Sequence, residues 1–402
     1  MEKVVITGMG SISCLGNNVN EYWNNLVEGK CGIGKITRID TENHDTTVAG
    51  QVDDTFETLV KKFWNKRQLN GVTAPCRMLM ASAGEAIEDS GVDFENYDRS
   101  RVAVIIGVID NGFVDSERNK MTNMVIKEMP SSGPALISSK FSLNGPAFNV
   151  SCACSSSGYA IGLGASLIES GMYDMVIAGG LSGFVTHDRI SGFNQILAMS
   201  ANPDPVTACR PFTKNRDGFI MGEGSGTIIL ESETAARNRN ARIYAKLSGY
   251  AFYSEASNMT APLEEGKGMN IVMAEALKKS GLKATDIDYI NAHGTSTNLN
   301  DKYETMAIKN LFGEHAYNLS VSSTKSAIGH TLAAGSALEA IATIKAINEG
   351  TVPPTVHFDE ADPELDLDYT PNTAKKREIK AAISNSFGFG GQNASLVFER
   401  YE

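Results

Sequence analysis

The 402-residue sequence predicts an α/β fold with mainly parallel strands, built as two similar halves. Three observations lead to this prediction. Short continuous apolar runs that end in glycine or serine are typical of strands buried on both faces of a sheet. Segments with apolar residues at helical spacing alternate with these runs. A strand, a turn rich in hydroxyl side chains and a small-residue helix follow one another once in each half of the chain.

Buried strands are predicted wherever β-branched residues dominate a short run that a glycine or serine closes. In chain order these runs are residues 4–10, 102–107, 175–180, 228–230, 289–294, 319–324 and 381–388. Helical spacing with a glycine stop predicts helices at residues 78–91, 157–171 and 332–350. Because no Pro-, Gly- or Ser-rich linker separates the halves, we expect fused lobes, residues 1–245 and 246–402.

Composition narrows the possible partners and the compartment. A net charge of −11 argues against nucleic acid. No apolar run approaches the roughly 20 residues that span a bilayer, so no membrane association is expected. The N-terminus MEKVVITGMG enters a strand without a signal-peptide pattern, which indicates a cytoplasmic protein. The six cysteines follow no metal-binding spacing, so we expect thiols and no metal site.

The segment NVSCACSSSG, residues 149–158, contains the most reactive-looking cysteine. Cys154 lies between a predicted strand and a predicted helix, whose start the following serines can cap. Backbone N–H groups and the helix dipole at such a position favour a thiolate, which is the nucleophile that attacks thioesters. A buried structural cysteine is an equally good interpretation of this segment taken alone.

Two histidines strengthen the catalytic interpretation. His293 ends a strand in NAHGTST, and His330 precedes a small-residue helix in KSAIGHTLAAG. A single histidine is more often structural, but two of them beside glycine and hydroxyl residues fit a condensation reaction. That chemistry needs a thiolate to hold an acyl group and donors to stabilise charge on a thioester carbonyl. The glycine-rich turn NSFGFGGQN, residues 385–393, would bring backbone N–H groups close to a ligand.

In this order and spacing, the motifs resemble the β-ketoacyl-acyl-carrier-protein synthases, above all the synthase II-like enzymes, and more distantly the polyketide ketosynthases. The resemblance runs nearly end to end. It covers VVITGMGSISCLGNN, SCACSSS, RPFTKNRDGFIMGEGSG, NAHGTSTNLND, SSTKSAIGHTLAAG, VPPT and NSFGFGGQN. It implies a thiolase-like five-layered αβαβα sandwich and a dimer, formed either with a second copy or with a ketosynthase-like subunit.

The resemblance also implies the catalytic residues. Cys154 matches the nucleophile, and His293 and His330 match the histidines that bind the malonyl thioester and promote loss of CO2. Lys325 matches a lysine that supports the second histidine, and Glu339 matches the glutamate of the same network.

Further matches concern the substrate arm. Phe389 matches a gating phenylalanine whose N–H, with that of Cys154, forms the oxyanion hole, and Thr295 and Thr297 match contacts to the pantetheine arm. The implied reaction is a decarboxylative Claisen condensation in fatty acid, polyene or polyketide biosynthesis. It needs no metal and no free cofactor, because the partner, an acyl carrier protein, carries the phosphopantetheine.

Two features concern the partner and the acyl chain. Carrier proteins are acidic, so a basic docking patch is expected, and KKFWNKR offers Lys61, Lys62, Lys66 and Arg67. A solvated helix face explains these charges equally well.

Asp110, in VIDNGFVDSERN, falls near the aliphatic residue expected at the floor of the acyl pocket. A carboxylate beside an alkyl chain is costly, so either Asp110 points elsewhere or the pocket is short or polar.

Other interpretations are compatible with parts of the sequence. A non-catalytic, chain-length-factor-like subunit generally lacks the nucleophile, and a malonyl-carrier-protein decarboxylase tends to replace it. A thiolase would have a second cysteine as base, and a chalcone synthase would have a Cys-His-Asn set. The presence of Cys154, His293 and His330 favours a condensing enzyme, with a specialised pathway slightly preferred over a housekeeping one.

Overall fold

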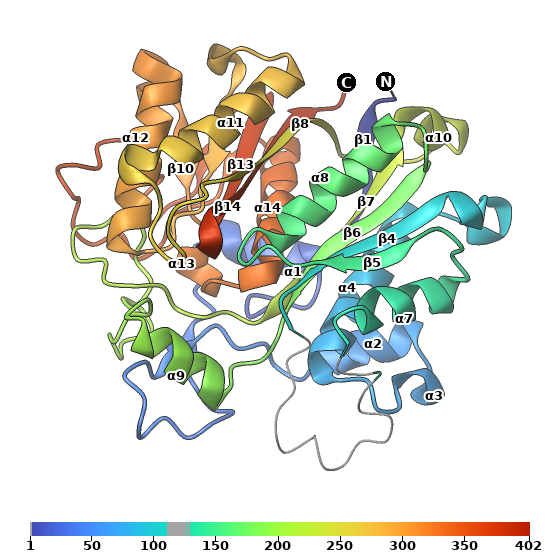
Figure 1. Ribbon diagram of the computed structural model, residues 1–402, viewed down its shortest axis with the longest axis horizontal. Coiled ribbons are helices and arrows are strands. Elements are labelled where there is room, and N and C mark those ends of the chain that lie inside the picture. Colours follow the sequence, from blue (N-terminus) through green and yellow to red (C-terminus); the bar gives the residue numbers. More distant parts are fainter. Residues whose placement is uncertain (1, 111–125, 127–128) are drawn as a thin grey trace.

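The fold is built around one large mixed sheet (Figure 1). In the computed structural model, residues 2–110, 126 and 129–402 are described. The strand order is β10-β9-β13-β14-β8-β1-β7-β6-β4-β5. The bounds of these strands are β1 Val4–Ser13, β4 Val102–Val108, β5 Ala147–Val150, β6 Met175–Ser182, β7 Gly224–Ser232, β8 Ala245–Ser254, β9 Tyr289–Asn291, β10 Ser320–Ser322, β13 Ala381–Gly388 and β14 Gln392–Arg400. All seven predicted strands are present.

The strand order repeats between the two halves. When the five sheet strands of each half are numbered along the chain, both halves have the order 3-2-4-5-1. The halves join through a short antiparallel pairing of β1 with β8, at Val4–Ile6. The prediction of two similar halves is therefore confirmed, and β8 begins at Ala245. The exact boundary after residue 245 stays a prediction.

The prediction of mainly parallel strands is wrong. Parallel pairing joins β5 to β4, β4 to β6, β10 to β9 and β9 to β13. The remaining five pairings of the sheet, which lie toward its centre, are antiparallel. One of them is a hairpin in which the turn Phe389–Gly391 connects β13 directly to β14, so no crossover helix is required.

Helices cover both half-sheets and fill the space between them, which gives five layers (Figure 1). One outer layer contains α4, which packs on β1, β7 and β6, and the other contains α11, which packs on β8 and β14. The middle layer is formed by α8 and α14, which contact strands of both halves and each other. The helix bounds are α1 Val19–Val27, α2 Phe56–Phe63, α3 Lys66–Leu69, α4 Ala74–Ser90, α7 Ser132–Phe141, α8 Ser156–Glu169, α9 His187–Gln195, α10 Glu233–Asn238, α11 Lys267–Ser280, α12 Asn298–Phe312, α13 Lys325–Ile328 and α14 Gly335–Glu349. The five-layered fold and the three predicted helices are thus confirmed.

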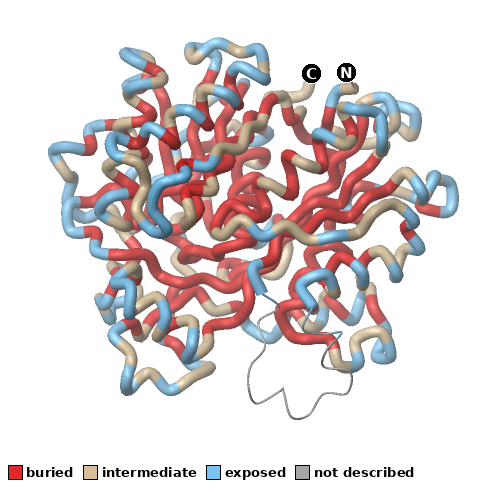
Figure 2. The backbone as a smooth tube through the Cα atoms, viewed as in Figure 1, coloured by how far each residue is buried: buried red, intermediate tan, exposed pale blue. Residues whose placement is uncertain are grey.

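The middle layer is buried along most of α14, whereas α8 also has half-buried and exposed residues (Figure 2). Glycines near the strand ends allow its helices to approach the sheet. A Cβ on Gly107 of β4 would lie 2.4 Å from the backbone nitrogen of Ser157 in α8, and one on Gly180 of β6 would lie 2.4 Å from the carbonyl oxygen of Ala333. The glycines that close the apolar runs therefore position the starts of α8 and α14, where the candidate catalytic residues lie.

Two expectations from composition can be compared with the structure. All six cysteines lie in the described part of the chain and are free thiols. Among the described residues, no helix is long and apolar enough to cross a membrane.

Candidate active site

A cavity of about 320 Å³ lies where strand ends of both halves meet. Its lining includes the residues that the sequence singled out as chemically important: Cys154, His293, His330, Thr295, Thr297 and Phe389. Cys154 comes from the first half of the chain and the other five come from the second. The fold therefore brings together motifs that are up to 235 residues apart in the sequence.

A tight turn between β5 and α8 carries Cys154. The residue before it, Ala153, has a φ of 47°, in the left-handed region that a non-glycine residue occupies at a cost of about 1 kcal/mol. The serines do not cap α8 as predicted but hold the turn. The Ser155 hydroxyl bonds the carbonyl oxygen of Cys152 at 2.8 Å, and the Ser156 hydroxyl accepts the N–H of Cys152 at 2.9 Å.

The predicted thiolate character of Cys154 is not found. Burial dominates and raises the pKa of its thiol to about 11, although a hydrogen bond from the backbone of Phe389 and the charge of Lys325 both lower it. The thiol belongs to an apolar cluster with Met199, Phe219 and Leu332. These two favourable contributions, together with the backbone N–H of Cys154 itself, are weaker than the desolvation of the buried sulfur.

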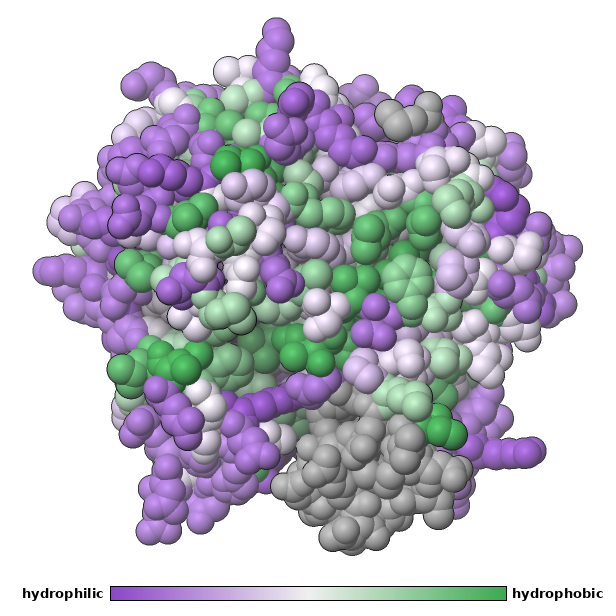
Figure 3. Space-filling model, viewed as in Figure 1, coloured by the Kyte–Doolittle hydropathy of each residue, from purple (hydrophilic) through white to green (hydrophobic). Residues whose placement is uncertain are grey.

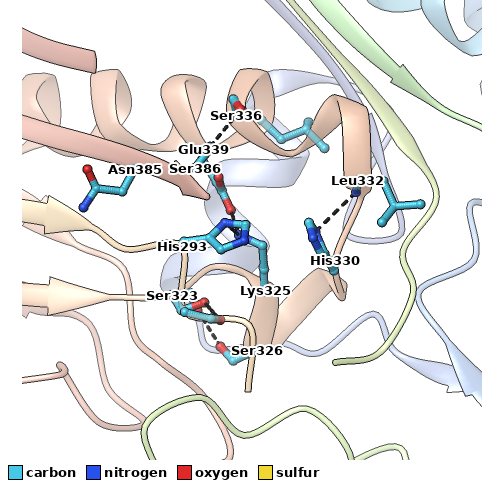
Figure 4. A network of polar contacts seen from close by, with 12 residues as sticks. His293, Ser323, Lys325, Ser326, His330, Leu332, Ser336, Glu339, Asn385 and Ser386 are labelled. Atoms are coloured by element: carbon cyan, nitrogen blue, oxygen red, sulfur yellow. Dashed lines mark hydrogen bonds and ion pairs between the residues drawn. The ribbon is translucent and has the colours of Figure 1, made fainter. Parts of the chain in front are cut away.

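Behind the cavity, His293 is held by a buried ion pair (Figure 4). The Lys325 ammonium donates a hydrogen bond to Nδ1 of His293 at 3.3 Å and forms an ion pair with the Glu339 carboxylate. Both charged side chains are only 2% exposed. The network predicted from the resemblance is present, but its hydrogen bond goes to the first histidine, His293, whereas we expected the lysine to support the second, His330.

A backbone contact orients His330. The N–H of Leu332 donates to Nδ1 of His330 at 3.3 Å (Figure 4). Because Nδ1 accepts a hydrogen bond in both histidines, the proton of each neutral ring lies on Nε2. The two rings are nearly perpendicular, with centroids 5.3 Å apart.

Both histidines are neutral in this environment. Burial lowers the pKa of His293 well below its usual range, with the charges of Lys325 and His330 acting in the same direction. Burial and Lys325 also lower the pKa of His330. The site therefore offers two neutral Nε2–H donors beside a thiol, which suits stabilisation of negative charge on a thioester oxygen.

The predicted gate and arm contacts lie on the same cavity. Phe389 begins the β13–β14 turn, in which Gly390 has a φ of 76°, a conformation that favours glycine. The hydroxyls of Thr295 and Thr297 lie 2.9 Å apart. Their position on the lining is compatible with contact to a polar arm.

Two predicted elements lie elsewhere. Asp110 is not among the lining residues; its half-exposed carboxylate forms an ion pair with Arg189 of α9. Of the two possibilities for this carboxylate, the structure thus supports the one in which it points elsewhere. Residues 111–119 of the predicted pocket floor lie outside the described residues.

The basic side chains are exposed on α2 and α3, away from the cavity lining: Lys61, Lys62, Lys66 and Arg67.

One buried carboxylate in this region was missed at the sequence level. Glu304 of α12 accepts the N–H of His293 at 2.9 Å and that of Gly294 at 2.8 Å. Burial raises its pKa to about 7. Glu304 lies at helical spacing from Asn300 and Ile308, which are both buried, and this spacing is the signal that could have indicated a buried carboxylate.

Among the described residues, no group of three or more acidic, histidine or cysteine side chains could hold a metal ion.

Comparison with known families matches most of the chain. Residues 1–236 match "Beta-ketoacyl synthase, N-terminal domain", and residues 244–359 match "Beta-ketoacyl synthase, C-terminal domain". The chain is 39% identical over 416 residues to "3-oxoacyl-[acyl-carrier-protein] synthase 2" of Synechocystis and 38% identical over 412 residues to the protein of that name from Staphylococcus aureus. Each alignment covers 100% of this chain and 99% of the relative.

Solved structures of the same fold cover the whole chain. A β-ketoacyl synthase from Burkholderia phymatum has a TM-score of 0.91 at 30% identity, and the ishigamide ketosynthase/chain length factor has 0.90 at 32%. A type II PKS ketosynthase, solved in complex with its acyl-carrier protein, has 0.89 at 29%. In all three comparisons, both chains are covered completely.

Proposed function

Because the chain belongs to the β-ketoacyl synthase family, we propose that it condenses an acyl group held on Cys154 with the two-carbon unit of a malonyl thioester. It is a condensing acyltransferase of the 3-oxoacyl-acyl-carrier-protein synthase class. The observation that carries this assignment of roles is the shared cavity, in which one thiol faces two neutral histidines that donate through Nε2.

The first half-reaction loads the enzyme. The sulfur of Cys154 attacks the carbonyl carbon of an acyl thioester, the bond from that carbon to the pantetheine sulfur breaks, and the proton of the cysteine leaves with the released pantetheine thiol. In this proposal the backbone N–H groups of Cys154 and Phe389 stabilise the oxyanion. Burial raises the pKa of the Cys154 thiol to about 11, so the thiol is protonated at neutral pH before it reacts.

The second half-reaction extends the chain. The Nε2–H groups of His293 and His330 hold the thioester oxygen of malonyl as its carbon–carbon bond breaks and CO2 departs. The electron pair left on the malonyl carbon then forms a bond with the acyl carbonyl, and the sulfur of Cys154 leaves and takes up a proton. The product is a β-ketoacyl thioester two carbons longer. Thr295 and Thr297 position the arm.

An acyl carrier protein is the proposed partner, and its phosphopantetheine supplies the thioester, so no metal or free cofactor takes part. One solved structure of this fold contains an acyl-carrier protein in complex with its ketosynthase, and another is a ketosynthase/chain length factor. Accordingly we propose a dimer, formed with a second copy or with a ketosynthase-like subunit. The pathway is fatty acid, polyene or polyketide synthesis. A non-catalytic subunit or a decarboxylase is less well supported because all three reacting side chains are in place.

The test is the mass of the intact protein after incubation with acyl-carrier thioesters of different length and unsaturation. We expect a gain of one acyl chain, its complete loss in Cys154→Ala, and its retention in the neighbouring Cys152→Ala. If no chain loads but malonyl-carrier protein still loses CO2, the protein is a decarboxylase. If neither occurs, it is a non-catalytic subunit.

A further inference from the structure

The hydroxyl of Ser155 lies between two segments of the candidate active site. Ser155 follows the nucleophile directly, in the turn of residues 152–156, which we call the nucleophile turn, and it is fully buried. Its Oγ lies 2.8 Å from the carbonyl oxygen of Cys152, in the same turn, and 2.5 Å from the carbonyl oxygen of Gln392, which begins β14. One side chain therefore bridges the two halves of the molecule beside the cavity.

The single proton of this hydroxyl can be donated fully to only one of the two carbonyl oxygens. The carbonyl oxygen of Cys152 already accepts the N–H of Ser155 at 3.1 Å. The proton therefore goes to Gln392, which is also the closer acceptor. The next hydroxyl along the chain differs, because that of Ser156 accepts the N–H of Cys152 and donates to the carbonyl oxygen of Ala153. Ser156 thus stabilises the nucleophile turn internally, whereas Ser155 connects it to the other half.

The β13–β14 turn also packs closely on the nucleophile turn. A Cβ on Gly388 would lie 3.0 Å from the carbonyl oxygen of Cys152 and 3.2 Å from Oγ of Ser155. On another side, the N–H of Gly390 donates to the carbonyl oxygen of Met259 at 2.7 Å. The first two residues of the β13–β14 turn are half-buried, and Figure 3 shows hydrophilic and hydrophobic residues side by side where β14 begins. Because burial is incomplete, these hydrogen bonds contribute much to holding the turn in place.

The N–H of Phe389 is the group whose position this contact affects. Burial raises the pKa of the Cys154 thiol, and the N–H of Phe389 opposes that rise by a hydrogen bond to the sulfur. This N–H therefore lies beside the reacting atom. Phe389 is only three residues before Gln392, so a shift of the β13–β14 turn would move its N–H relative to Cys154. A donor stabilises an oxyanion well only at about 3 Å from the charged oxygen.

We propose that Ser155 is a positioning residue for acyl transfer. Its hydroxyl ties the β13–β14 turn to the nucleophile turn and thereby fixes the N–H groups of Cys154 and Phe389 relative to each other. This inference rests on the proposed function, because the two N–H groups act as a pair only when an oxyanion forms on the acyl carbon. Donors held in place before the reaction are the ones that stabilise such a charge best.

The experiment compares two reactions of the same sulfur, both measured by mass on the peptide that contains Cys154. One is loading from the acyl-carrier thioester that loads the parent protein best, and the other is alkylation by iodoacetamide, which forms no oxyanion. Ser155→Ala should lower the maximal rate constant of loading about tenfold at an unchanged half-saturating concentration, and change the alkylation rate less than about threefold. The matched control is Ser90→Ala, which removes another buried hydroxyl that donates to a carbonyl oxygen, that of Ile87, and should leave both rates unchanged.

A second variant moves the acceptor and keeps the hydroxyl. In Gly388→Ala the new Cβ would lie 2.8 Å from the carbonyl oxygen of Gln392, so this oxygen must shift, and the selective loss of loading should recur even if Ser155→Ala does not fold. Loading at the parent rate in Ser155→Ala, or equal losses of loading and alkylation, would overturn the positioning role while the proposed function stands. If the parent protein is alkylated at Cys154 but loads no acyl chain, the proposed function fails and the positioning role fails with it.

Discussion

The two halves of the molecule share a strand order but hold their reactive groups by different means. The connection from the third strand to the following helix carries Cys154 in the first half, between β5 and α8. In the second half, the segment between β10 and α14, which includes the short helix α13, carries Lys325 and His330. In the first half, backbone geometry and hydroxyl groups fix an uncharged thiol. In the second half, a buried ion pair supports the histidine network.

This difference shows that the same strand order can support both an uncharged nucleophile and hydrogen-bond donors that need a fixed tautomer. A thiol that must move little and carry charge only briefly is held well by a strained turn in apolar surroundings. Donors that must keep a fixed tautomer need partners with full charges or oriented N–H groups. Because α8 and α14 pack against each other, the two kinds of support end at one cavity.

The division of roles between the two halves is tested most directly by measuring loading of Cys154 and condensation separately. We expect His293→Ala to lower the rate of condensation about 1000-fold, because a donor to the developing enolate is lost, while Cys154 still loads within a few-fold of the parent rate. Loading is measured by intact mass and condensation by the release of CO2 and β-ketoacyl product. Equal losses in both steps would show that the halves do not divide the reaction.

The next largest effect concerns the stability of the second half. Glu339→Gln leaves the buried Lys325 ammonium without an ionic partner and should lower the free energy of unfolding by about 3–5 kcal/mol. The matched control is Glu364→Gln, which removes a surface ion pair with Lys302 and should cost less than about 1 kcal/mol. Urea denaturation measures both. A cost for Glu339→Gln no larger than that of the control would mean that the ion pair does not support this half.

Two carboxylates, the half-buried Glu85 in the first half and the buried Glu304 in the second, predict how stability changes with pH. Glu85 accepts the N–H groups of Ser11 and Val19, and Glu304 those of His293 and Gly294. Burial raises the pKa of each to about 7. Each group is therefore protonated in the folded state over a range in which the unfolded chain is ionised, so its contribution is complete below about pH 4.5 and is lost as the pH rises to about 7.

The loss should reach about 3 kcal/mol for each carboxylate, and Glu85→Gln and Glu304→Gln should each flatten part of the slope in denaturation series from pH 4.5 to 7.5. Activity distinguishes them. Glu304→Gln should slow condensation at least about tenfold by loosening the His293 turn, whereas Glu85→Gln should not. If the two variants affect condensation equally, Glu304 does not position the histidine.

The smallest effect is expected at the turn before the nucleophile. Ala153→Gly relieves the left-handed backbone but gives the unfolded chain more freedom, so the free energy of unfolding should change by less than about 1 kcal/mol. Ala153→Val, which is β-branched, should cost about 2 kcal/mol. Thermal denaturation compares the two. If valine were tolerated as well as glycine, the turn would not be held in this conformation.

Much of the fold could be predicted because local sequence patterns indicate where its strands and helices lie. Apolar runs closed by glycine gave the positions of β1, β4 and β6, and the recurrence of a strand, turn and small-residue helix indicated two halves. Strand direction was not predictable in this way. The antiparallel β1 and β7 are buried on both faces, so they are as apolar as parallel strands and lack the alternation that usually identifies antiparallel pairing.

The sequence allowed the residues of the candidate site to be predicted, but not their pKa values or hydrogen-bond partners. Cys154, His293 and His330 were identified from their motifs, and they line one cavity. Burial raises the pKa of Cys154, and its apolar cluster includes Met199 and Phe219, which are distant from it in the sequence. Likewise, the contact of Lys325 with His293 joins α13 to the segment that follows β9, and no sequence pattern predicts that contact.

The middle layer has a consequence for how this chain could be divided. A single apolar core contains residues of both halves, including Ile161 of α8, Ile341 of α14 and Phe398 of β14. A cut in the exposed connection at Asn240 would leave each fragment with one side of that core open to water. Such fragments should be insoluble when expressed singly and should reassemble when co-expressed, so the chain is suited to a split-protein reporter; soluble folding of either fragment alone would contradict this.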